Sequence, residues 1–63
     1  MKYKIGDKVK FLNDVGGGVI IKILSPTMVE VAVEDGFNIP VLVLGYIKMG
    51  GVFILKTSFV TAL

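Results

Sequence analysis

The chain has 63 residues, a formal net charge of +2, and neither cysteine nor histidine. These absences exclude a disulfide framework and a thiolate metal site, and they remove the commonest general base. A chain this short makes one domain, residues 1–63, and buries only about 60% of its unfolded surface, so apolar packing has to stabilise it. Its hydrophobic residues reach 54%. We therefore expect a protein partner or a second copy to cover the excess apolar surface.

The first strand is predicted over residues 7–12. Val9 and Phe11 alternate there with Lys8 and Lys10. A period of two is typical of a strand with one buried face and one solvated face.

A loop is predicted over residues 13–18, because three successive glycines favour irregular backbone. The same glycines have a second interpretation as an anion-binding nest, although no Gly-Lys-Ser/Thr follows to make a P-loop. Residues 19–24 form the second predicted strand, which is apolar enough to be covered on both faces near its middle. Ser-Pro-Thr at 25–27 ends it.

The third strand is predicted over residues 28–33, where valine occupies alternate positions. Glu-Asp-Gly at 34–36 predicts a hairpin turn, since Asp-Gly suits positive φ. The fourth strand follows over residues 37–43. Its Pro40 cannot donate to a ladder, so the strand is expected to be an edge or to bend there.

Glycines at both ends of residues 44–51 predict a short turn, and residues 52–55 a fifth strand. The pattern leaves residues 56–63 open between a short sixth strand and a terminal helix. No ten-residue segment carries a helical stripe. Short strands joined by short loops predict an all-β fold, a small five-stranded SH3-like barrel.

Four lysines near the amino terminus lie at even-numbered positions: Lys2, Lys4, Lys8 and Lys10. In an extended segment they would form a basic stripe on one face. One interpretation is a phosphate-contacting edge for nucleic acid. The other is the solvated face of an edge strand, where lysine discourages aggregation.

The aromatic residues fall into two groups. Phe11 and Phe53 are predicted to be core. Tyr3, Phe37 and Tyr46 have two interpretations: an exposed platform for stacking or peptide docking, or side chains that close the ends of the barrel.

Nothing in the sequence pairs a carboxylate or hydroxyl with an activating base. We therefore expect no enzymatic activity, no catalytic residue, no metal, no cofactor and no small-molecule substrate. All five acidic residues lie in the first 35 positions, and residues 36–63 carry only two charges, Lys48 and Lys56. This acid-free half is the less soluble one.

The segment Gly-Asp-Lys-Val-Lys-Phe-Leu at 6–12 resembles the opening of SH3-like barrels of the Tudor and KOW kind. With Val-Gly-Gly-Gly at 15–18 and Glu-Asp-Gly-Phe-Asn-Ile-Pro-Val at 34–41, the chain resembles the uncharacterised amino-terminal domain of Bacteroidetes proteins that carry a Smr (small MutS-related) domain. The resemblance covers about residues 2–43, and residues 44–63 diverge. It implies a barrel accessory module linked to DNA repair or recombination, and it transfers no catalytic residue because the Smr part is missing.

Two functions follow as hypotheses. The first is a non-enzymatic module that binds nucleic acid through Lys2, Lys4, Lys8 and Lys10 with Tyr3 or Phe37. The second is a protein-interaction or self-assembly module that uses the apolar carboxyl-terminal half. A membrane-associated peptide is a third reading, but the apolar stretch 39–55 contains proline, glycine and lysine and is shorter than the ~20 residues of a spanning helix. With no signal peptide visible, we expect a cytoplasmic location.

Overall fold

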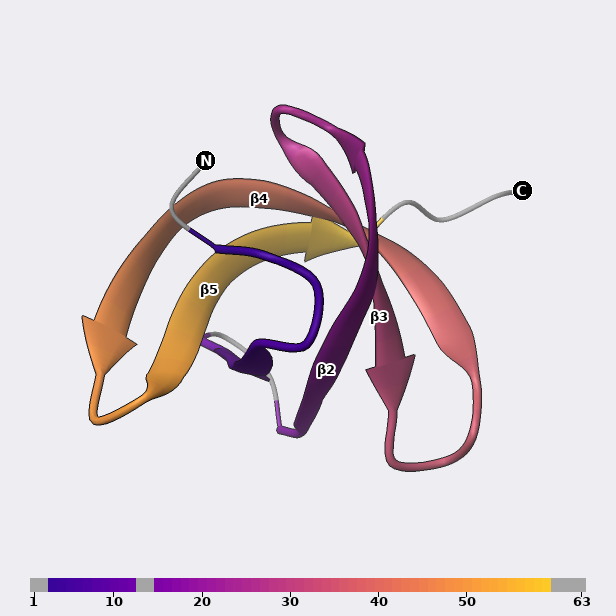
Figure 1. Cartoon of the computed structure of the whole chain (residues 1–63), viewed down its shortest axis with the longest axis horizontal. Coiled ribbons are helices and arrows are strands. Elements are labelled where there is room, and N and C mark those ends of the chain that lie inside the picture. The colour runs from indigo at the N-terminus through magenta and orange to yellow at the C-terminus, as the bar shows by residue number, and fades with distance from the viewer. Residues whose placement is uncertain (1–2, 13–14, 60–63) are drawn as a thin grey trace.

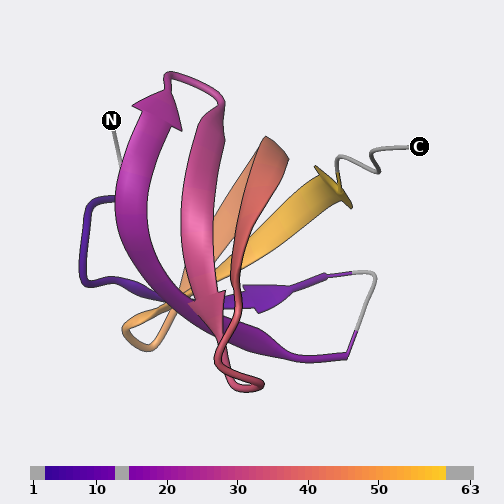
Figure 2. The ribbon, with the colours of Figure 1, turned by 90° about the vertical axis from the view of Figure 1, so that its right-hand side faces the viewer.

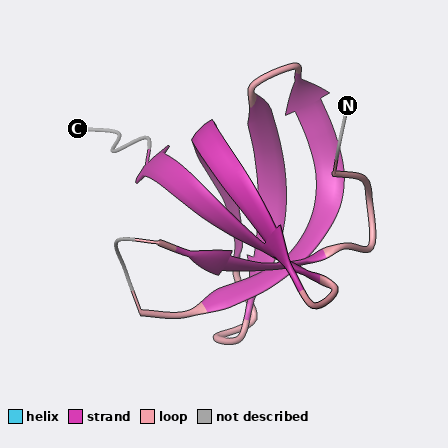
Figure 3. Ribbon diagram, turned by 90° about the vertical axis from the view of Figure 1, so that its left-hand side faces the viewer, coloured by secondary structure: helices cyan, strands magenta, loops and turns pink. Residues whose placement is uncertain are grey.

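The computed structural model describes residues 3–12 and 15–59, and the regular structure of this part is entirely β-strand (Figures 1 and 3). The strands are β1 (Lys8–Phe11), β2 (Gly17–Ser25), β3 (Met28–Val33), β4 (Asn38–Met49) and β5 (Val52–Phe59). The predicted fold class, a small all-β barrel of five strands, is confirmed.

Each strand pairs antiparallel with the next along the chain, and β5 pairs with β1 to close the barrel. This closing pair is parallel, in the register Lys8↔Val52 to Phe11↔Leu55. Five strands in simple up-and-down order require this, because the first and the fifth run in the same direction. Figure 2 shows the strongly curved β2 wrapping around one side of the barrel.

The interior is filled only by apolar side chains, as the period-two pattern predicts. The buried residues of the described part are Tyr3, Val9, Phe11, Ile20, Val29, Val31, Val41, Val43, Phe53 and Leu55. None of the described polar or charged residues is buried. Alternation along β3 places Val29 and Val31 inside, both at 0% exposure, and the prediction that Phe11 and Phe53 are core is confirmed.

Both hairpin turns of the second half depend on glycine in the left-handed region. Between β3 and β4, the Gly36 amide donates to the Val33 carbonyl (3.0 Å), the Val33 amide donates to the Phe37 carbonyl (2.9 Å), and Gly36 has φ +90°. This is the predicted Asp-Gly turn, a three-residue loop. Between β4 and β5, Gly50 and Gly51 have φ of 57° and 88°, as a two-residue type I′ turn requires.

The glycine run before β2 differs from its prediction. The loop was expected to continue through residue 18, but Gly17 and Gly18 belong to β2 and pair with Lys10 and Val9. A methyl group on Gly17 would overlap the carbonyl oxygen of Val9, and one on Gly18 would overlap that of Ala32. Glycine is therefore present for close strand packing, not for a loop. Residues 13 and 14 of that loop lie outside the described residues.

The expectation that β2 is covered on both faces is also wrong. Eight of its residues, 18–25, span only the six of β3, because the register shifts between Ile20 and Lys22 and again between Ile23 and Ser25. Ile21 and Leu24 are the extra residues, and they are 37% and 42% exposed. Each bulge bends the strand and turns one aliphatic side chain toward solvent.

The carboxyl-terminal half is where the structure differs most from the prediction. Residues 44–51 were predicted to be a turn, but β4 continues to Met49 and only Gly50 and Gly51 turn. Gly45 lies inside the strand, next to the register shift between Val43 and Gly45. Residues 56–59, left open between a sixth strand and a helix, continue β5, and residues 60–63 lie outside the described part.

The prediction that the chain forms an edge or bends at Pro40 is compatible with the described pairing. Pro40 faces Glu30 of β3. On its other side, the described β5 pairing begins only at Val41↔Phe59. The missing N–H of proline therefore falls where no described strand requires it.

Candidate interaction surface on the β4–β5 hairpin

The amino-terminal segment does not form the predicted basic stripe. The Lys4 amide donates to Asp7 Oδ2 (2.8 Å), the Asp7 amide donates to the Lys4 carbonyl (3.1 Å), and Gly6 has φ +97°. This turn breaks the extended backbone that would be needed to place the even-numbered lysines on one face. Lys8 and Lys10 share the outer face of β1, whereas Lys4 lies in the turn and Lys2 lies outside the described residues.

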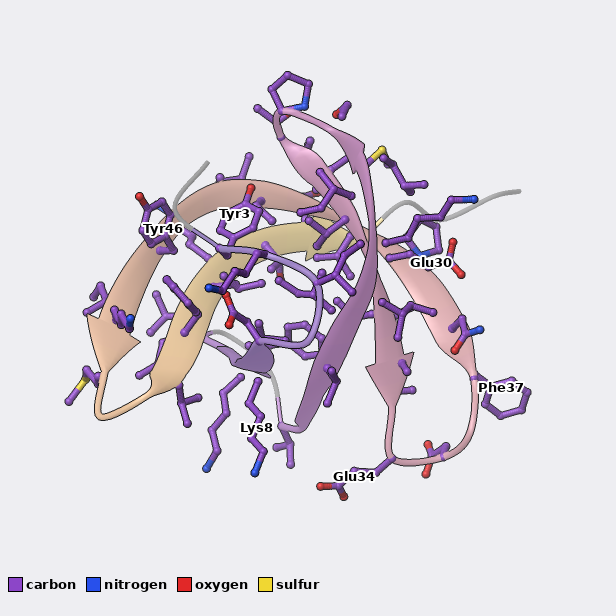
Figure 4. The ribbon with its side chains drawn as sticks, in the orientation of Figure 1. Tyr3, Lys8, Glu30, Glu34, Phe37 and Tyr46 are labelled. Atoms are coloured by element: carbon purple, nitrogen blue, oxygen red, sulfur yellow. The ribbon has the colours of Figure 1, made fainter. Side chains whose placement is uncertain are left out.

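Tyr3 is not part of an exposed platform. It is 5% exposed, and its ring makes edge-on contacts with Tyr46 (centroids 5.6 Å apart) and Phe53 (6.2 Å). Its hydroxyl donates a long hydrogen bond, 3.5 Å, to the Pro26 carbonyl. Phe37 is 68% exposed and lies on the opposite side of the molecule (Figure 4). The platform interpretation is therefore wrong, and Tyr3 packs against the end of the core instead.

This packing changes the acid–base chemistry of Tyr3. Burial raises the pKa of its phenol above the ordinary value of 10.0, and the nearby Tyr46 adds to the rise. The cause is desolvation, which disfavours the charged phenolate. The raised pKa reflects packing of Tyr3 in the fold, since the hydrogen-bond partner of its hydroxyl is a backbone carbonyl, that of Pro26.

The outer face of the β4–β5 hairpin carries aliphatic side chains that the core does not use. Phe53 and Leu55 of β5 point inward, so alternation directs Val52 and Ile54 outward. Directly opposite them on β4 are Met49 and Ile47, which are 60% and 56% exposed. We call these four residues, Ile47, Met49, Val52 and Ile54, the hairpin patch.

Lysines border the hairpin patch. The parallel pairing of β1 with β5 places Lys8 beside Val52 and Lys10 beside Ile54 on the same outer face. Figure 4 shows Lys8 pointing away from the barrel. Lys56, two residues beyond Ile54 on β5, extends this face further.

One described carboxylate lies near this border: Glu34 lines a groove together with Lys8, Lys10 and Val52. Asp7 is in the amino-terminal turn and Glu30 is on β3, while Glu34 and Asp35 form the turn between β3 and β4. The patch is therefore aliphatic at its centre, with lysines along its border and Glu34 in the adjoining groove.

The edge of β4 beside the hairpin patch is open. β3 pairs only with residues 38–42 of β4, and the Val43 amide donates to the Thr27 carbonyl (2.8 Å). From Leu44 to Met49, β5 is the sole strand partner among the described residues. On the inner face of this edge, Lys48 Nζ lies 5.4 Å from the centroid of Phe53.

A smaller concave surface adjoins the groove lined by Lys8, Lys10 and Val52 and shares Phe11 and Glu34 with it. It is a cavity of about 370 Å³ between the β1–β2 connection and the β3–β4 turn. Phe11, Val33 and Ile39 contribute apolar walls, and Glu34 and Asp35 lie at its rim. Apart from these two carboxylates its lining carries no ionisable or hydroxyl side chain, and the part of the chain that the structure describes has no group of three metal-ligating side chains.

Comparison with known families adds one finding. The model of a family of domains of unknown function (DUF8465) matches residues 8–44, more than half of the chain. The chain belongs to this family. The matched DUF8465 region runs from β1 to the bulge in β4, so the hairpin patch lies beyond it. No curated protein and no solved structure matches the chain. No helix that could span a membrane occurs among the described residues of this DUF8465 domain.

Sequence reasoning missed the hairpin patch because it placed Ile47 and Met49 in a turn. The available signal was the consecutive apolar run at 52–55, which lacks the alternation seen in β3. A strand that is apolar at every position needs cover on both faces. Here the barrel covers only one of them.

Proposed function

We propose that this domain is a non-enzymatic protein-interaction module that docks through the hairpin patch. The observation that carries the proposal is that both faces of the β4–β5 hairpin bear apolar side chains. Phe53 and Leu55 already complete the core on the inner face, yet four aliphatic side chains occupy the outer face. Contiguous exposed apolar surface on a small domain is typical of a docking site.

The chemistry of the chain supports a binding role over catalysis. The sequence has no histidine or cysteine, and the cavity between the β1–β2 connection and the β3–β4 turn lacks a nucleophile paired with a base. An aliphatic centre with a polar border is the usual anatomy of a protein interface. The lysine border favours a partner surface with accessible acceptors or carboxylates.

Nucleic-acid binding is the second candidate, favoured by the position of Lys8 and Lys10 on one outer face. The resemblance to the amino-terminal domain of Bacteroidetes Smr proteins supports it and would make the domain an accessory module in DNA repair or recombination. Two observations weigh against it. Tyr3 is buried, and the hairpin patch offers aliphatic side chains where stacking on bases requires aromatic ones.

The solution mass separates the two candidates. With no partner identified, self-association is the direct probe of the patch. We expect light scattering to give a mass above 6.8 kDa that persists or rises with salt, because salt strengthens apolar association. A mixed-sequence duplex should leave the mass unchanged. A monomer that binds duplex only at low salt would contradict the proposal and support nucleic-acid binding.

Two variants make this test specific to the patch. Ile47→Lys places a charge at its centre and should lower the mass to that of the monomer. Ile21→Lys places the same charge on a bulge residue of β2, 37% exposed, and should leave association intact. Equal effects from both variants would contradict docking through the hairpin.

A further inference from the structure

We infer that the partner is a second copy of this chain, joined by antiparallel pairing of the open β4 edges about a two-fold axis at Ile47. This inference rests on the proposed function and specifies its partner. An unpaired strand edge is a template for another strand. Here the edge runs from Leu44 to Met49 beside exposed aliphatic side chains, with Lys48 its only charge.

The β4–β5 hairpin determines which backbone groups face the open side. A two-residue turn closes on the pair Met49↔Val52, and a hairpin of this type begins with a hydrogen-bonded pair. Because hydrogen-bonded and non-bonded pairs alternate, Ile47 and Met49 direct their backbone groups toward β5. Tyr46 and Lys48 direct theirs to the open edge, so these two residues must make the hydrogen bonds to an added strand.

Few symmetric registers satisfy this requirement. A shift by one residue would bring inner-face side chains opposite outer-face ones. An axis at Lys48 would place two lysines directly opposite each other, which is destabilising. An axis at Tyr46 would pair Lys48 with Leu44, which is the extra residue at the bulge.

An axis at Ile47 has none of these faults. It pairs Tyr46 with Lys48 of the partner subunit, and Lys48 with Tyr46 of the partner subunit, so each ammonium faces an aromatic ring. The two Ile47 side chains meet at the axis, and Met49 falls opposite Gly45 of the partner subunit, where there is open space. The chain is thus self-complementary in this register.

The pairing also extends the hairpin patch. Two copies joined at Ile47 form one continuous sheet, in which both hairpin patches lie on the same outer face. The lysines Lys8, Lys10 and Lys56 remain at the border of this combined face and are not brought together. The acid-free half of the sequence therefore needs no compensating carboxylate at the junction.

Cysteine cross-linking tests the register, because the native chain has no cysteine. Directly opposed residues at a non-hydrogen-bonded position have Cα atoms about 4.5 Å apart, within the range of a disulfide. Ile47→Cys at micromolar concentration with oxidised glutathione should give a disulfide-linked dimer as the main product. Met49→Cys and Ile21→Cys should cross-link at least tenfold more slowly, since neither residue meets its own copy.

The outcomes separate this inference from the proposed function. If the native chain self-associates but Ile47→Cys links no faster than the two controls, the β4 edge pairing is overturned and docking through the hairpin patch stands. If the native chain stays monomeric, both fail. A double variant, Gly45→Cys with Met49→Cys, offers an independent check, since it should link across the axis even if Ile47→Cys perturbs the centre.

Discussion

The strand β3 and the β4–β5 hairpin use apolar residues in contrasting ways. Along β3, the buried Val29 and Val31 alternate with the partly exposed Glu30, and both edges of the strand are paired. Along the hairpin, apolar side chains lie on both faces. The outer edge of β4 from Leu44 to Met49 has no strand partner among the described residues. The first pattern is sufficient to close a core, whereas the second leaves apolar surface and backbone groups for another molecule.

This contrast concerns how strongly each region contributes to stability. Burial of β3 and its neighbours supplies the folding free energy, so truncations there should be severe. The hairpin patch contributes little to the isolated domain and should tolerate truncation. Two pairs of substitutions, each with one member inside the closed part of the barrel and the other in the β4–β5 hairpin, separate these contributions.

The largest difference is expected between Ile20→Ala and Ile47→Ala. Ile20 is 0% exposed and Ile47 is 56% exposed. Removing the buried side chain should lower the free energy of unfolding by about 2–5 kcal/mol, and the exposed one should change it by less than about 0.5 kcal/mol. Urea denaturation of the dilute protein measures both. Similar losses would show that the hairpin patch belongs to the core.

The next largest difference is expected between two glycines of the sheet. Gly18→Ala forces a methyl group against the Ala32 carbonyl oxygen and should cost about 1–3 kcal/mol or more. Gly45→Ala, where nothing lies within 4 Å, should be neutral or stabilise by up to about 1 kcal/mol. Thermal unfolding distinguishes them. A well-tolerated Gly18→Ala would mean that β2 does not approach β3 this closely.

The smallest effect concerns Tyr3, which joins the two regions by packing on Tyr46 and Phe53. Its pKa in the folded state is raised above 10.0. The unfolded chain therefore loses this proton first, so the stabilisation is complete below pH 10 and is lost as pH rises through the folded pKa.

Tyr3→Phe keeps the ring and removes the titration. Above pH 10 the native domain should lose more stability than Tyr3→Phe does, whereas at pH 7 the two should differ little. Denaturation at both pH values provides the comparison. Parallel losses in the two proteins would place the Tyr3 hydroxyl in solvent.

Much of the fold could be predicted from the sequence because local patterns determine it. Alternating valines gave β3, and Asp-Gly gave its turn. The errors arose where non-local geometry decides. The close approach that requires glycine at 17 and 18 depends on strands distant in sequence, and the bulges of β2 depend on its pairing with β3.

The candidate site was less predictable for the same reason. The even-numbered spacing grouped Lys4 with Lys8 and Lys10, but a turn around Gly6 separates Lys4 from the other two. The grouping of Lys8 with Val52, which defines the border of the hairpin patch, depends on the parallel closure of the barrel. No short-range pattern encodes that contact, whereas the apolar excess of the second half led us to expect a partner surface.

The most direct test of the hairpin as a docking surface is a backbone amide NMR spectrum recorded over a range of protein concentrations. Shifts that move with concentration should cluster on residues 44–49 and on Val52 and Ile54, while the amides of β3 stay fixed. Concentration-dependent shifts confined to the cavity between Phe11 and Glu34, or no such shifts at millimolar protein, would contradict this account.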